Sequence, residues 1–92
     1  MRTLLSALVT IVLVAGCAVG SGAVVKGVGS DDLLKLREGP GLEHRIIIGL
    51  PDGTPLIRQN CLTNSGKLWC KVALADRPSV SGYVSADYLA LR

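Results

Sequence analysis

Three cysteines and a single histidine carry the most specific chemistry that this chain offers. Cys61 and Cys70 enclose the stretch CLTNSGKLWC, in which the only tryptophan, Trp69, directly precedes the second cysteine. A zinc site needs about four ligands, and the one further candidate, His44, is distant in the sequence. A redox pair is usually spaced C-x-x-C at the start of a helix, whereas eight residues separate these cysteines. A structural disulfide is the third option, and it depends on the compartment of the protein.

The first residues, MRTLLSALVTIVLVAGC, indicate the compartment. Arg2 provides a positive start, residues 4–15 form an uncharged apolar run, and the small residue Gly16 follows. The run is shorter than the ~20 residues that a permanent membrane-spanning helix needs. A charged start, a short apolar core and small residues are typical of an export signal. We therefore predict a cleaved signal peptide over residues 1–16 and an extracytoplasmic protein.

The end of this leader, VAGC, resembles the bacterial lipobox. The resemblance implies cleavage before Cys17, attachment of lipid to its thiol, and a membrane-anchored lipoprotein. Ordinary secretory cleavage after Ala18 or Ala23 is the main alternative, giving a periplasmic or secreted protein, and a retained anchor is a third. If Cys17 carries lipid or is lost with the leader, Cys61 and Cys70 remain as an even pair. Because exported proteins meet an oxidising environment, we predict a Cys61–Cys70 disulfide.

The mature chain is large enough for one small domain. Cleavage before Cys17 leaves 92 − 16 = 76 residues, with three aromatic side chains, Trp69, Tyr83 and Tyr88, and no phenylalanine. Leucine, isoleucine and valine must therefore form most of the core. At this size a core rarely supplies more than about 3–5 kcal/mol. Closing a ten-residue loop adds roughly 2.5 kcal/mol, so the disulfide is expected to matter for folding.

Charge and composition suggest the domain limits and exclude some partners. The formal net charge is +3 and the chain has no run of basic residues, so we expect no nucleic-acid partner. Residues 17–30 are rich in Gly, Ala and Ser, which predicts a flexible tether before a domain at 31–92. Alternatively Val24, Val25 and Val28 supply an opening strand, and the domain then begins near residue 24.

Beyond Ser30 the sequence alternates short β-rich runs with turns. Strands are expected at 33–37, 44–50, 55–61 and 67–74, followed by one or two in SGYVSADYLAL around a tight turn at 85–87. Within 67–74 the alternation places Cys70 with Leu68, Val72 and Leu74 on one face, and Trp69 with Lys71 on the other. The pattern predicts an all-β fold, a small barrel of five or six short strands with a short 3-10 turn near the C-terminus. The segment SDDLLKLREG could instead be a helix capped by Ser30, which leaves 33–37 open.

Four pieces of the sequence, LKLREGPG, IIGLPDGTPL, LWCKVAL and SGYVSADYL, occur in an order that resembles the bacterial SH3-like (SH3b) domain. The resemblance implies a five- or six-stranded barrel without a catalytic centre, which binds cell-wall peptides or other peptide partners. The chain departs from the family pattern in three ways, one of which is that residues 61–64 lengthen the hairpin that carries the disulfide. Cys70 stands where an aromatic residue often follows the tryptophan, and Tyr83 stands where the family commonly has tryptophan. Both reduce the aromatic surface available to a ligand.

The candidate ligand-binding residues are Trp69, Tyr83, Tyr88 and Arg37. The three aromatic residues could form a shallow surface for an extended peptide. The competing interpretation, which we favour, is packing of Trp69 against Tyr83 with Tyr88 anchoring the last turn, because aromatic core material is scarce here. Arg37 and Arg58 could hold a peptide carboxylate, although we favour the interpretation that they lie on solvated strand faces.

We predict no enzyme, no metal and no cofactor, because the acidic residues show no pairing and His44 has no nucleophile motif around it. The leading hypothesis is a non-enzymatic extracytoplasmic module that binds a cell-wall peptide or an envelope protein. One alternative is a structural or accessory envelope lipoprotein that acts by protein–protein contact. Another is a secreted enzyme inhibitor that uses the loop LTNSGKL.

Overall fold

The computed structural model describes residues 20–92. The predicted signal peptide (1–16) and the predicted lipidation site, Cys17, lie outside the described residues. From residue 20 onward, no helix is long and apolar enough to cross a bilayer.

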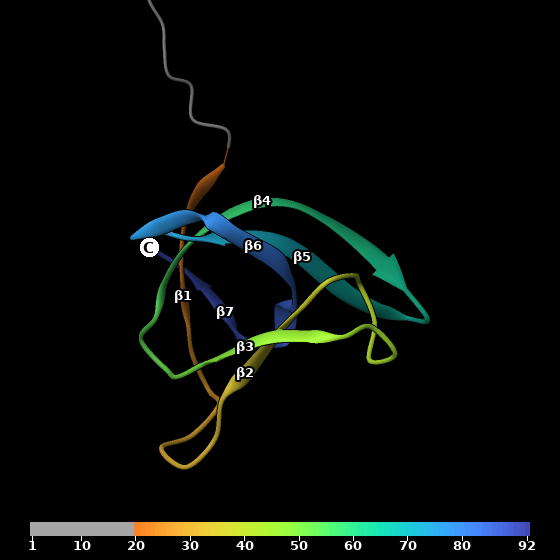
Figure 1. Cartoon of the computed structure of the whole chain (residues 1–92), viewed down its shortest axis with the longest axis horizontal. Coiled ribbons are helices and arrows are strands. Elements are labelled where there is room, and N and C mark those ends of the chain that lie inside the picture. Colours follow the sequence, from red (N-terminus) through yellow and green to blue (C-terminus); the bar gives the residue numbers. More distant parts are fainter. Residues whose placement is uncertain (1–19) are drawn as a thin grey trace, which may run out of the picture.

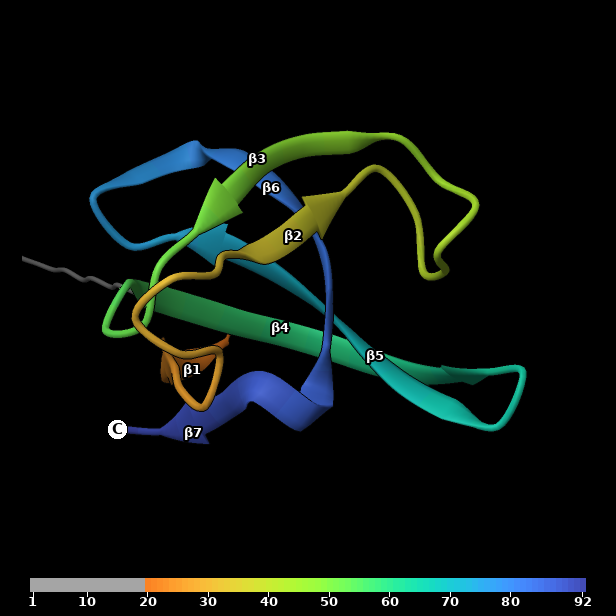
Figure 2. The same cartoon turned by 90° about the horizontal axis from the view of Figure 1, so that it is seen from below.

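The described chain forms one antiparallel sheet that curls into a half-barrel (Figures 1 and 2). Its elements are β1 (Ser21–Val25), β2 (Leu34–Arg37), β3 (Ile46–Leu50), β4 (Pro55–Asn64), β5 (Lys67–Leu74), β6 (Arg77–Ser85), the 3-10 turn η1 (Ala86–Tyr88) and β7 (Leu89–Leu91). The strand order is β3-β2-β6-β5-β4-β1-β7. The predicted all-β architecture and the 3-10 turn near the C-terminus are confirmed. Residues 20–92 form seven strands, not five or six.

The additional strand is β1, which lies inside the segment that we expected to be a flexible tether, 17–30. It pairs with β4 on one side and with β7 on the other. Ala23 and Val25 alternate toward the core and are almost completely buried, because a strand presents every second side chain to the same face. Residues 21–25 are therefore part of the sheet, as in the alternative in which Val24 and Val25 open the fold.

The segment that could have been helical is strand β2. Leu34 and Leu36 are buried, which is the period of two expected of a half-buried strand. β2 pairs with β3 from Leu34 opposite Leu50 onward, with a register shift between Leu36 and Arg37. The short helix is not formed, because a strand here buries both leucines and satisfies its backbone within the sheet.

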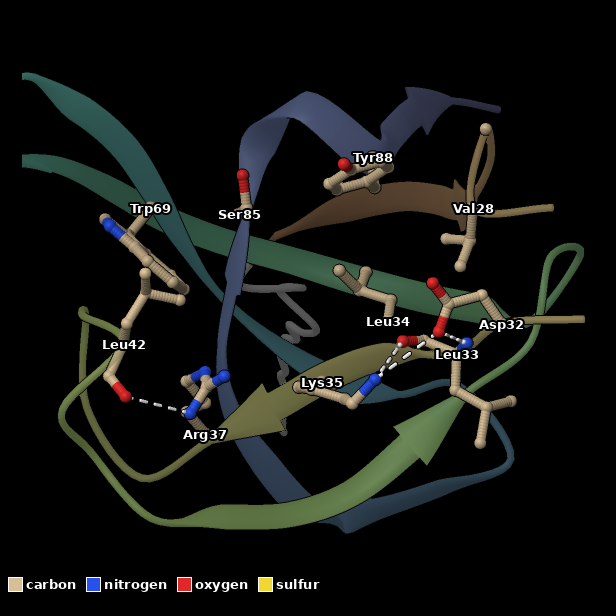
Figure 3. Close-up of a pocket in the computed structure, with 11 residues that line it drawn as sticks. Val28, Asp32, Leu33, Leu34, Lys35, Arg37, Leu42, Trp69, Ser85 and Tyr88 are labelled. Atoms are coloured by element: carbon tan, nitrogen blue, oxygen red, sulfur yellow. Dashed lines mark hydrogen bonds and ion pairs between the residues drawn. The ribbon is translucent and has the colours of Figure 1, made fainter.

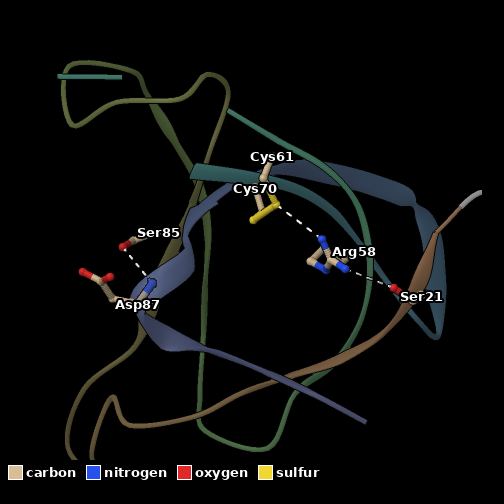
Figure 4. The surroundings of a disulfide bond; sticks show 6 residues. All are labelled: Ser21, Arg58, Cys61, Cys70, Ser85 and Asp87. Carbon is tan, nitrogen blue, oxygen red and sulfur yellow. Dashed lines mark hydrogen bonds between the residues drawn. A yellow bond between two sulfur atoms is a disulfide. The ribbon is translucent and has the colours of Figure 1, made fainter. Parts of the chain in front are cut away.

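Strands β4 and β5 form the longest hairpin, and the Cys61–Cys70 disulfide joins them. Ser65 and Gly66 make the turn with positive φ angles of 53° and 78°, the geometry of a tight two-residue hairpin loop. Cys61 faces Cys70 in the ladder, and their sulfur atoms are bonded at 2.01 Å. Figure 4 shows the Arg58 side chain pointing toward this disulfide, and its Nη1 atom lies 3.6 Å from the Cys61 Sγ. The predicted disulfide is thus present in the structure.

Strand β5 departs from simple alternation at Trp69. Cys70, Val72 and Leu74 are buried as expected, but Leu68 on the same face is 46% exposed. Trp69, on the opposite face, is only 4% exposed. Leu68 is exposed because the hairpin tip extends beyond the core, whereas Trp69 is covered by a loop from another part of the chain.

Candidate functional site

Trp69 lies where two surface hollows meet. The first hollow has a volume of about 230 Å³ and the second of about 260 Å³. Trp69 and Leu42 line both hollows, so the hollows lie on either side of this pair, and we call the two together the Trp69 groove. Its centre is apolar, as is usual for sites that bind peptide side chains.

Both ends of the groove combine apolar and charged side chains. The first hollow is lined by Gly27, Val28, Asp32, Leu33, Leu34, Lys35, Arg37, Leu42, Trp69, Ser85 and Tyr88. The second is lined by Gly41, Leu42, Glu43, Asn64, Ser65, Lys67 and Trp69. The groove therefore collects residues from β2, β4, β5, β6, η1 and three loops or turns, and no single segment of sequence encodes it.

Leu42 and Trp69 form the narrow centre of the groove. In Figure 3 the Leu42 side chain lies against the indole ring, between the ring and Arg37. Leu42 is 73% exposed, so most of its side chain remains in contact with solvent, whereas Trp69 beside it is 4% exposed. On the neighbouring strand, Ser85 is the ladder partner of Trp69 and forms an adjacent part of the wall.

Two sets of hydrogen bonds hold the loop that carries Leu42, residues 38–45. Arg37 Nη1 donates to the carbonyl oxygen of Leu42 at 3.1 Å and to that of His44 at 3.0 Å. From the opposite side, the Asn64 side-chain amide donates to the carbonyl oxygen of Pro40. The loop is thus attached both to β2 and to the tip of the disulfide hairpin, which brings these two regions together around Trp69.

A profile of the bacterial SH3 domain family matches residues 32–90. The chain belongs to the bacterial SH3 domain family. Its members are binding modules, and the match covers nearly the whole described sheet after β1. Neither the curated proteins nor the solved structures that were compared include a match to this chain.

In this bacterial SH3 domain, three of the four predicted ligand-binding residues come together. Trp69, Tyr88 and Arg37 all line the first hollow. Tyr83 is not among the residues that line either hollow, and it stands between Arg37 and Lys71 in the sheet. Trp69 has features of both sequence-based interpretations. Its ring is buried, as packing requires, and it also lines both hollows, as ligand contact requires.

Charged side chains at the rim of the groove are paired with each other. Lys35 Nζ lies 3.5 Å from Asp32 Oδ1, and Lys67 Nζ lies 2.7 Å from Asp87 Oδ2. The backbone N–H of Leu33, and then the charge of Lys35, lower the pKa of Asp32. The hydrogen bond and charge of Asp87 raise the pKa of Lys67. The rim is thus close to neutral overall, and the apolar centre is the more specific feature of this SH3 domain.

Sequence reasoning missed Leu42, which the bacterial SH3 domain places at the centre of its groove. A signal was present, because Leu42 is a large apolar residue in the otherwise polar turn EGPGLEH. In the structure Leu42 lines both hollows together with Trp69. Within residues 20–92, no three His, Cys, Asp or Glu side chains are grouped as a metal site requires.

Proposed function

We propose that this bacterial SH3 domain is a non-enzymatic extracytoplasmic module that binds an extended cell-wall peptide in the Trp69 groove. The observation that carries the proposal is the position of Trp69 and Leu42 between two neighbouring hollows. Trp69 is only 4% exposed, so an apolar side chain of a peptide can pack against the indole once Leu42 moves aside, with the peptide backbone along either hollow. Aromatic anchors of this kind supply most of the affinity in many peptide complexes.

The polar atoms around the groove suit a peptide backbone. The Ser85 hydroxyl accepts a bond from the Asp87 N–H at 3.3 Å and can still donate its proton to a ligand carbonyl. Arg37 is committed to the loop carbonyls through Nη1, and Lys35 and Lys67 are engaged with carboxylates. A ligand recognised here is therefore held mainly by apolar contact and backbone hydrogen bonds, not by a large opposite charge.

The leader places this groove outside the cytoplasm in our proposal. Cleavage after Ala23 would remove part of β1, including Ala23 itself, which is completely buried and pairs with Leu56 and Leu91. Cleavage before Cys17 and cleavage after Ala18 both leave β1 intact, and of these two the lipobox resemblance of VAGC favours a lipid-bearing Cys17 and a membrane-tethered domain. Labelling with a radioactive fatty acid should mark the wild type but not Cys17→Ala. An unlabelled wild type would end the lipoprotein proposal and leave secretory cleavage after Ala18.

The ligand is tested by co-sedimentation with purified peptidoglycan. Leu42→Glu and Tyr88→Ala should each weaken retention by about tenfold, since loss of a central contact costs at least ~1 kcal/mol. Leu91→Ala is the matched control, because Leu91 is exposed on β7 and lies outside both hollows. Retention that is the same for Leu42→Glu and wild type would exclude the Trp69 groove as the site.

An envelope protein is the second candidate ligand. An experiment at the same groove can distinguish it from a cell-wall peptide. A photo-crosslinking amino acid at position 42 would capture such a partner in cells, because Leu42 is largely exposed. A reproducible crosslinked protein that is absent from an Arg37→Met strain, together with no binding to peptidoglycan, would favour a module that acts by protein–protein contact.

A further inference from the structure

Strand β3 is an open edge of the sheet. It is the outermost strand, with β2 as its only neighbour in the described sheet. Its first three residues, Ile46, Ile47 and Ile48, are 46%, 43% and 38% exposed. Natural edge strands are usually protected by charged residues, proline or very short length. The stretch from Ile46 to Leu50 has neither a charged residue nor a proline, whereas the other edge strand, β7, is only three residues long.

The three isoleucines follow one another along the open edge, and we call them the β3 edge patch. Successive side chains of a strand point to opposite faces, so the patch covers both faces of this edge. Ile48 stands opposite Leu36, which is completely buried, so its side chain extends the core face to the rim of the sheet. Ile47 lies over β6, because a Cβ atom added at Gly82 would meet its Cδ1 at 3.0 Å. The patch is therefore an ordered apolar surface beside unpaired backbone groups.

The charges that flank β3 make the strand complementary to itself. Arg45 precedes the strand, and its side chain is 79% exposed although it pairs with Glu38. Asp52 follows the strand and accepts bonds from the N–H groups of Val28 and Gly29, which fixes the position of its carboxylate. In an antiparallel pair of identical strands, the start of each strand lies beside the end of the other. Arg45 of one copy would thus approach Asp52 of the other copy.

We propose that β3 pairs with β3 of a second copy of this chain, antiparallel and about a two-fold axis near Ile48. The pairing satisfies the backbone groups of both edges and buries the two β3 edge patches against each other. It goes beyond the proposed function, because Ile46, Ile47 and Ile48 lie outside both hollows of the Trp69 groove. Two grooves would then be presented on one continuous sheet.

Sedimentation velocity on the full chain tests the pairing. Between about 10 μM and about 1 mM, the mass should rise from one copy toward two, since an interface of this size gives a weak complex. Ile48→Lys places like charges at the two-fold axis and should weaken association by about tenfold or more. Leu91→Lys is the matched control on the other edge strand and should associate as the wild type does.

A charge exchange makes the test specific for the symmetric arrangement. Ile48→Lys and Ile48→Glu should each remain single copies alone and should associate when mixed, because the lysine of one then faces the glutamate of the other. A wild type that stays a single copy at the highest concentration would overturn the proposal. Equal association of Ile48→Lys and Leu91→Lys would overturn it as well, and would indicate contacts elsewhere in the chain.

Hydrogen exchange on the wild type keeps the proposal testable even if a variant fails to fold. The amides of Ile46–Leu50 that point away from β2 should exchange more slowly as the protein concentration increases. The amides of Leu89–Leu91 on the other edge should show no such dependence. Exchange in β3 that is independent of concentration would contradict pairing between copies.

Discussion

The two walls of the Trp69 groove are attached to the protein in different ways. On one side, β4, β5 and β6 form continuous antiparallel ladders, and the Cys61–Cys70 disulfide crosslinks the first two. On the other side, the β2–β3 hairpin joins this half of the sheet through a single ladder pair, Arg37 and Tyr83. Figure 2 shows the β2–β3 and β4–β5 hairpins apart from each other, with their loops projecting in the same direction and β6 running from one to the other.

This difference indicates where the groove can adapt. The β4–β5–β6 side is held by backbone hydrogen bonds and a covalent bond, which are local and directional. The β2–β3 side is held mainly by burial of Leu34, Leu36 and Leu50, together with the bonds from Arg37 and Asn64 to the loop. We therefore expect the first side to act as a rigid floor and the loop with Leu42 to move when a ligand enters.

The largest effect is expected from removing the apolar attachment of β2. Leu36 is completely buried, so Leu36→Ala should lower the free energy of unfolding by about 3 kcal/mol through lost burial and a cavity. Urea unfolding followed by circular dichroism measures the change. Leu68→Ala at the exposed hairpin tip is the control and should change the free energy by less than about 0.5 kcal/mol. Similar losses for the two variants would mean that burial does not attach β2.

The disulfide should contribute slightly less, and on the opposite side of the groove. Cys61→Ala combined with Cys70→Ala should lower the free energy of unfolding by roughly 2.5 kcal/mol, because the unfolded chain regains the freedom of a ten-residue loop. Thermal unfolding would show a decrease of about 10–20 °C for a domain of this size. Cys17→Ala is the control and should leave the midpoint unchanged. An unchanged midpoint in the double variant would show that the ladders alone stabilise the hairpin.

The hydrogen bonds from Arg37 are expected to have a smaller effect on stability and a clear effect on the groove. Arg37→Met removes both bonds to the loop and should cost about 1 kcal/mol. The emission of Trp69, the only tryptophan, should shift to longer wavelength as Leu42 leaves the ring. Arg45→Met removes an exposed arginine that pairs with Glu38 and should leave the emission unchanged. An emission shift in both variants would assign the effect to charge and not to the loop.

The smallest effects are expected from the rim ion pairs, at opposite ends of the pH scale. The pKa of Asp32 is lowered, so its stabilising contribution is present above its ordinary value of 3.8 and is lost as the pH falls through the lower folded value. The pKa of Lys67 is raised, so its contribution is present below 10.5 and is lost as the pH rises through the higher folded value. Stability measured against pH for Asp32→Asn and Lys67→Gln should converge with the wild type in acid and in base respectively. Differences that persist at both extremes would assign the two residues a role other than ion pairing.

Local patterns were sufficient for most of the strands and for the disulfide. Leu34 and Leu36 alternate with polar residues, and β-branched residues fill β3, so both strands follow from side-chain period and propensity. The turn at Ser65–Gly66 brings Cys61 opposite Cys70, which their spacing already indicated. The predicted strand boundaries were less accurate. Strand β3 begins at Ile46 and not at residue 44, because Arg37 holds residue 44 in the preceding loop.

Strand β1 and the groove could not be assigned in the same way. The glycine- and alanine-rich composition around β1 is that of a linker, and Ala23 and Val25 become core residues only because β4 and β7 lie on either side of them. Leu42 and Trp69 are 69 − 42 = 27 positions apart, and the curl of the sheet brings them together. Alternation along a chain specifies which residues face inward, since it reflects the geometry of one strand. Contacts between distant segments depend on how the strands are ordered and curved, which is a property of the assembled sheet.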